Sequence, residues 1–142
     1  MHAEEFLTRP REINKEIRRQ EAIADEIRNS LEPQAIRYDR DKVQTSPVDP
    51  VPNMIARLDE KLTEIERLKE CRYCAMLEID RVLSLLDDQD ERTVLTHWYL
   101  MDECEEDVLE AAMCSMRTMY RIKQRGLQHV EEILMKVGSE WQ

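Results

Sequence analysis

The chain has 142 residues, a formal net charge of −10, 37% charged and 5% aromatic residues, and two glycines. This composition is typical of helices and coiled coils, and it excludes a Gly-rich phosphate loop, a nucleophile elbow and a membrane span. The opening MHAEEFL is acidic and lacks the apolar core of a signal peptide, so we expect a cytoplasmic protein. Because the catalytic motifs are missing and no nucleophile–base pair stands at local spacing, we expect that it is not an enzyme.

Residues 4–31 have the spacing of an amphipathic helix. Apolar residues recur at alternating intervals of three and four, and charged residues occupy the other faces. Pro10 suits a first turn or a kink, so the stable helix is expected to begin near Arg9. The stripe consists of Phe6, Ile13, Ile17, Ala24, Ile27 and Leu31, with Pro10 and Gln20 in the remaining positions.

Residues 32–53 interrupt this pattern with four prolines and are predicted to be a linker. Asp49 followed by Pro50 is typical of an N-cap and a first helical residue. Ser46 followed by Pro47 is an alternative start for the next helix.

Residues 50–86 form the longest predicted helix. Lys69 and Arg72 interrupt its apolar stripe, which predicts a shift of register there. Because neither long helix can bury its stripe alone, we expect an antiparallel hairpin that also forms a homodimer. The stripe consists of Ile55, Leu58, Leu62, Ile65, Met76, Ile79, Leu83 and Leu86, with Leu68 and Ala75 serving the shifted part.

Two of the four cysteines, Cys71 and Cys74, form a C-x-x-C. The pair lies in the middle of a predicted helix, without a second C-x-x-C or a βαβ pattern nearby. Reduced structural thiols are therefore favoured over a zinc or redox site. We expect no metal and no cofactor.

Residues 87–142 contain three shorter helical patterns. Acidic residues open the first two, 89–100 and 103–113, as suits helix N-termini. Ser115 is a good N-cap for the third, which is predicted to end at Val137 before Gly138. Two short helices, a tight turn and a third helix make a helix-turn-helix unit.

The predicted fold is therefore all-α. A helical hairpin with its proline-containing linker occupies residues 1–86, and a small helix-turn-helix domain occupies residues 87–142. Among the side chains of the second domain, His97 and the methionines are expected to pack in the core. These methionines are Met101, Met113, Met116, Met119 and Met135.

The segment between Glu110 and Glu131 contains no carboxylate, although the chain is acidic. On a helical wheel its apolar residues share one face, and long hydrogen-bond donors share the opposite face. Arg can read guanine, Gln can read adenine, and flanking basic residues can hold phosphates. This face is predicted to be a recognition helix for double-stranded DNA; an ordinary solvated surface is the alternative. Its donors are Arg117, Arg121, Gln124 and Gln128, with Tyr120 and Arg125 on the flanks and the backbone near Ser115 at its start.

The segments VLTHWYL (94–100) and SMRTMYRIKQRGLQHV (115–130), with the acidic helix between them, resemble region 4 of sigma factors. The chain is more similar still to phage and prophage regulators of the ArpU/RinA type, along nearly its whole length. The most specific parts of this resemblance are YDRDKVQTSP and RTMYRIKQRGL. It implies a DNA-binding transcriptional regulator with a recognition helix that starts at Ser115. By position, Arg117, Thr118, Tyr120, Arg121 and Arg125 match the family's polar residues.

Three departures from the family pattern bear on the docking geometry. Met113 replaces the usual glycine of the turn, and methionine resists a left-handed backbone. Leu109 replaces a small alanine and is expected to push two helices apart. Met101 and Asp102 stand in a turn that usually holds glycine. The alternative function is therefore a protein-interaction module that contacts RNA polymerase or a phage partner through acidic helices, with a decayed DNA-reading face.

Overall fold

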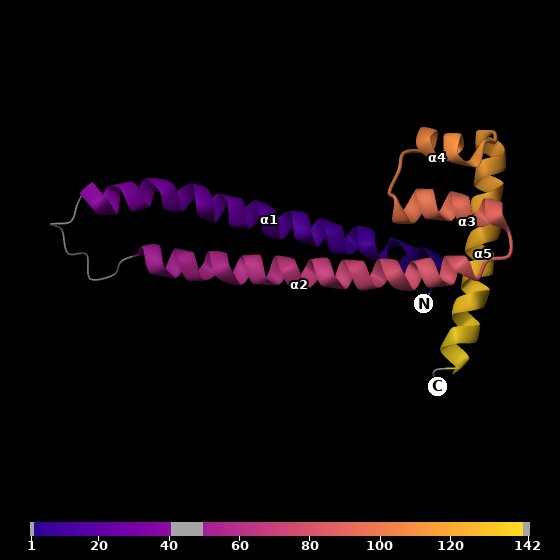
Figure 1. Cartoon of the computed structure of the whole chain (residues 1–142), viewed down its shortest axis with the longest axis horizontal. Coiled ribbons are helices and arrows are strands. Elements are labelled where there is room, and N and C mark those ends of the chain that lie inside the picture. Colours follow the sequence, from indigo (N-terminus) through magenta and orange to yellow (C-terminus); the bar gives the residue numbers. More distant parts are fainter. Residues whose placement is uncertain (1, 41–49, 141–142) are drawn as a thin grey trace. The chain divides into compact units, whose positions relative to one another are not determined.

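The computed structural model describes residues 2–40 and 50–140, without the side chains of 32–40 and 138–140. All elements in these ranges are helical, which confirms the predicted all-α class (Figure 1). They are α1 (Ala3–Arg40), α2 (Pro50–Ser84), α3 (Gln89–Leu95), the π-helical turn η1 (Thr96–Leu100), α4 (Glu105–Ala112) and α5 (Met116–Glu140).

The chain divides into two compact units, which we call the hairpin unit and the C-terminal unit. The hairpin unit spans residues 13–71. The described part of the C-terminal unit comprises residues 2–12 and 72–140. The sequence instead predicted a single boundary between residues 86 and 87.

In the hairpin unit, α1 and α2 lie side by side and run in opposite directions (Figure 1). Their stripes meet in a small core made of Ile17, Ala24, Ile65 and Leu68, flanked by Ile13 and Leu58. Burial of Leu68 agrees with the predicted shift of register on α2. Ile55 and Leu62 were expected in the stripe but are exposed. Leu58 and Ile65 supply the contacts of this part of α2 with α1.

Helix α1 is longer at both ends than the sequence predicted. It begins at Ala3 rather than near Arg9, and it contains a buried Pro10. Proline removes one backbone hydrogen bond. The burial of Ala3, Phe6 and Leu7 in the C-terminal unit offsets that loss.

The linker prediction for residues 32–53 is wrong for its first part, because α1 continues through Pro33 to Arg40. Extending an existing helix adds one hydrogen bond for each residue fixed, so a long helix tolerates one interruption. Helix α2 begins at Pro50, as predicted. The predicted caps Asp49 and Ser46 lie outside the described residues.

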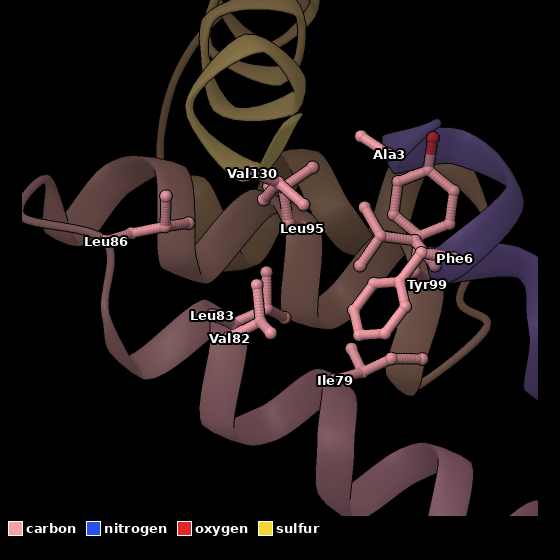
Figure 2. Packing of buried hydrophobic residues seen from close by; sticks show 10 residues of the cluster. Ala3, Phe6, Ile79, Val82, Leu83, Leu86, Leu95, Tyr99 and Val130 are labelled. Atoms are coloured by element: carbon pink, nitrogen blue, oxygen red, sulfur yellow. The ribbon is translucent and has the colours of Figure 1, made fainter. Parts of the chain in front are cut away.

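The core of the C-terminal unit joins segments from both ends of the sequence (Figure 2). The start of α1, the end of α2, α3, η1 and α5 all contribute to it. Its buried members are Ala3, Phe6, Leu7, Ile79, Val82, Leu83, Leu86, Leu95, Tyr99 and Val130. The helix-turn-helix elements therefore share one core with the first turns of α1.

The three C-terminal helical patterns are present, with changed ends. The pattern predicted as one helix over 89–100 changes at Thr96 into η1, where the Met101 N–H donates to the Thr96 carbonyl at 2.9 Å. Helix α4 is shorter than the predicted 103–113. Helix α5 continues through Gly138, where the sequence predicted an end. A glycine inside a helix costs only about 1 kcal/mol, which neighbouring turns can offset.

Candidate nucleic-acid interface

Helix α5 packs at short distance on α3. Met119, Ile122 and Val130 are buried on one face of α5, as the wheel predicted. Gly126 lies on the same face, and a Cβ atom there would come within 2.8 Å of Leu95 Cδ1. Leu95 is fully buried, so a larger residue at position 126 would require its side chain to shift within the core. The contact fixes which side of α5 faces outward.

The outward side of α5 brings the predicted DNA-binding residues together. All eight are exposed. A shallow, open surface depression adjoins this side, and all of its lining residues come from α5 itself. It is lined by Arg117, Thr118, Tyr120, Arg121, Ile122, Gln124 and Arg125.

The charge on this side is positive. Helix α5 contains no carboxylate before Glu131. Within the described residues, no carboxylate oxygen lies within 4.0 Å of the guanidinium groups of Arg117 and Arg121. Arg125 has one loose partner, since its Nη2 lies 4.0 Å from Asp88 Oδ2. The two arginines nearest the start of α5 are therefore available to an anionic partner.

Ser115 and Thr118 form the N-terminal cap of α5. The Thr118 N–H donates to Ser115 Oγ at 3.3 Å, and the Ser115 hydroxyl donates to Thr118 Oγ1 at 2.9 Å. Ser115 thus satisfies one of the backbone donors that a helix start leaves without an internal partner. Both hydroxyl groups are at the surface, beside the first turn of the exposed face.

Tyr120 has a structural role in addition to its exposure. Its hydroxyl donates to the Glu105 carboxylate at the start of α4. Its ring meets Trp98 of η1 edge-on, with 6.2 Å between ring centroids. This predicted DNA-binding residue therefore links α5 to both preceding elements.

Lys123 belongs to the basic run in the sequence but not to the exposed face. Its Nζ lies 4.0 Å from the centroid of the Trp98 ring. The ring centroids of Tyr99 and Tyr120 lie 5.9 and 5.8 Å from the same atom. Partial burial lowers the pKa of Lys123. This cation–π contact fastens α5 to η1. Helical spacing places Lys123 on the other side of the helix from Arg121, two residues away, but it does not indicate the contact with Trp98.

Arg11 is a positioning residue that sequence reasoning missed. Its Nη2 donates to the Trp98 carbonyl at 3.1 Å and lies 2.9 Å from Asp102 Oδ1. Asp102 has a left-handed backbone, with φ 49°. Arg11 thus secures the turn between η1 and α4, and nothing local in the sequence indicates a contact across such a long separation.

The turn before α5 has the left-handed backbone that methionine was expected to resist. Met113 has φ 55° and ψ 46°, which is left-handed, and its N–H donates to the Leu109 carbonyl at 2.9 Å. Leu109 packs half-buried beside the cluster of Val94, Val108, Met119 and Ile122. The turn therefore forms without glycine, and the strain falls on Met113.

The expectation that the methionines fill the core is wrong for four of the five. Only Met119 is buried; Met101, Met113, Met116 and Met135 are exposed. His97 is half-buried, and its Nδ1 lies 2.9 Å from Glu103 Oε2. Helical spacing alone did not separate these methionines from core residues, because they lie at turns and flanks.

The described residues contain no cluster of three or more His, Cys, Asp or Glu side chains that could hold a metal ion. Cys71 and Cys74 are both exposed on α2, so they are not buried packing residues. Among residues 2–40 and 50–140, no helix is long and apolar enough to cross a membrane.

Comparisons with protein-family models, with curated proteins and with solved structures gave no match.

Proposed function

We propose that this chain is a sequence-specific DNA-binding protein, and that it acts in the cytoplasm as a transcriptional regulator of the phage or prophage type that its sequence resembles. One observation carries the proposal. The side of α5 that faces away from the core presents exposed Arg117 and Arg121, with no carboxylate along the helix before Glu131. In a chain of net charge −10, this is a local positive surface on a single exposed helix face.

The chemistry of this face suits duplex DNA. Guanidinium groups bind the O6 and N7 atoms of guanine, and amide groups such as those of Gln124 and Gln128 bind adenine. Arg125 and the cap of Ser115 and Thr118 lie on the flanks, where they suit phosphate oxygens. Acidic residues at the start of α4 would repel phosphate from the neighbouring surface and so orient the duplex.

A homodimer through the long helices extends this proposal. Ile55 and Leu62 leave apolar side chains of α2 exposed in the hairpin unit. A symmetric pair of chains would present two recognition helices to two half-sites. Selection of random duplexes by the purified chain, followed by sequencing, would then give an inverted repeat.

The first prediction concerns Arg121. Replacing Arg121 by Ala lowers affinity for the selected duplex by about ten- to a hundredfold, because a bidentate contact with a base is lost. Affinity is measured by fluorescence anisotropy over a series of salt concentrations, and Arg117→Ala is expected to act in the same direction. The matched control is Arg57→Ala, an exposed arginine of α2, which should leave affinity unchanged.

The selection of random duplexes tests DNA binding itself. If the folded chain enriches no duplex, DNA binding is overturned and the protein-interaction module becomes the better proposal. The exposed acids Glu106 and Asp107 in the first turn of α4 favour that second function. Reversing their charge should then abolish a DNA-free complex with RNA polymerase or another protein.

A further inference from the structure

Met113 and Met116 form an exposed apolar pair at the start of α5, which we call the methionine tip. Met113 occupies the turn between α4 and α5 and is 90% exposed. Met116 is the first residue of α5 and is 49% exposed. Apolar side chains that stay in water contribute nothing to the hydrophobic stabilisation of the fold. The tip therefore has no evident role within the isolated chain.

The backbone adds a second observation at the same place. Met113 has a left-handed conformation, which costs a residue other than glycine about 1–2 kcal/mol. Backbone strain of this kind is concentrated at ligand-contacting sites. Met113 thus has a strained backbone, and its exposed side chain gains no burial that would offset the strain.

The surroundings of the tip indicate its partner. Arg117 directly follows Met116, and there is no carboxylate between Glu110 and Glu131. The guanidinium groups of Arg117 and Arg121 on the α5 side of the tip complement a polyanion, while exposed Glu110 stands on the α4 side. Duplex DNA presents one apolar group in its major groove, the C5-methyl group of thymine, and phosphates lie on both sides of that groove. An apolar tip beside guanidinium groups matches this arrangement.

We propose that the methionine tip contacts thymine C5-methyl groups in the bound duplex, so that Met113 and Met116 help to determine sequence specificity. This inference rests on the proposed DNA binding. Methionine suits the role because its unbranched, polarisable side chain adapts to a small apolar group.

Deoxyuridine provides a direct test, because it differs from thymidine only by the absence of the C5-methyl group. Each thymine of the selected duplex is replaced in turn by deoxyuridine, and affinity is measured by anisotropy. For the unchanged chain, each contacted methyl group is expected to contribute about fourfold to affinity. In Met113→Ala or Met116→Ala the corresponding loss should disappear. Met135→Ala is the matched control, since Met135 is 74% exposed on the same helix but far from its start.

The outcomes separate this inference from the proposed function. If the chain binds the duplex but deoxyuridine has no effect at any position, the inference is overturned and DNA binding stands. The same holds if the effect persists in both tip variants. If the tip variants instead change the sedimentation of the DNA-free protein, the tip is a protein contact. If no duplex is bound at all, the proposed function and the inference fail together.

Discussion

The left-handed turn residue Met113 carries the clearest strain in the described residues. Replacing Met113 by Gly removes a left-handed backbone strain of about 1–2 kcal/mol from the folded state. Glycine also raises the conformational entropy of the unfolded chain, which lowers stability by about 0.5–1 kcal/mol. We therefore expect the free energy of unfolding to rise by roughly 0.5–1 kcal/mol. Urea unfolding followed by circular dichroism measures this change.

The control for this substitution has the opposite sign. Ala111 lies in the right-handed backbone of α4 and is exposed. Ala111→Gly should lower stability by about 1 kcal/mol. If Met113→Gly lowered stability as much as Ala111→Gly, the left-handed backbone of Met113 would not be a source of strain.

At the residue scale, sequence reasoning identified which side chains of α5 face outward, because helical periodicity alone determines that. It placed Arg117, Arg121 and Gln128 on the exposed side, and it expected resistance at Met113. It could not show that Lys123 packs on Trp98 or that Arg11 binds the Trp98 carbonyl. Those contacts depend on how separate elements meet, which no local pattern encodes.

At the scale of elements, α3 and α5 are joined by a buried carboxylate. Glu91 of α3 is almost fully buried, and its Oε2 lies 2.8 Å from Nδ1 of His129 on α5. The hydrogen bond to Glu91, followed by the attraction of its charge, raises the pKa of His129 above 6.5. Glu132 also raises this pKa and Arg125 lowers it. A protonated His129 therefore stabilises the packing of α5 on α3.

The sign of the pH dependence follows from this raised pKa. The stabilisation is complete below the unfolded pKa of 6.5, and it is lost as the pH rises through the higher folded value. His129→Gln keeps a hydrogen-bond donor without the charge. The stability difference between the unchanged chain and this variant should be largest near about pH 5.5 and should shrink toward about pH 9.

Comparing the unchanged chain with His129→Gln isolates the contribution of His129 to the pH dependence of stability. The pKa of His2 is also raised, through its hydrogen bond to Glu131, but His2 is present in both chains and its contribution cancels. Unfolding in urea at a series of pH values gives the two stability curves. A constant difference between them would mean that His129 has the same pKa in the folded and unfolded states.

Element types were largely predictable and element ends were not. Apolar spacing indicated α1, α2 and α5 because each has a continuous stripe. The change from α3 to η1 at Thr96 could not be predicted, since THWYL has the same helical pattern in either form. Gly126 gave no local signal of its role either, because its importance comes from Leu95 on another helix.

At the scale of the molecule, the C-terminal unit is discontinuous in sequence. The change from long to short helical patterns suggested a boundary after residue 86, and the helix-turn-helix domain was predicted to span residues 87–142. Its core instead includes Ala3, Phe6 and Leu7. A period of three and four residues shows that Phe6 is buried somewhere, but it does not show which partner buries it. The packing of Phe6 in this core could not be predicted because its partners are far away in the sequence.

This core makes a prediction about a residue far from α5 in sequence. Leu7 is fully buried in the C-terminal unit, so Leu7→Ala should cost about 2–5 kcal/mol. Amide hydrogen exchange at Met119 and Val130 of α5 should then become at least about thirtyfold faster. Ile17→Ala is the matched control, because Ile17 is equally buried in the same helix but belongs to the core of the hairpin unit. If both substitutions accelerate exchange in α5 equally, the two units unfold together; if only Leu7→Ala does so, the first turns of α1 are an integral part of the helix-turn-helix unit.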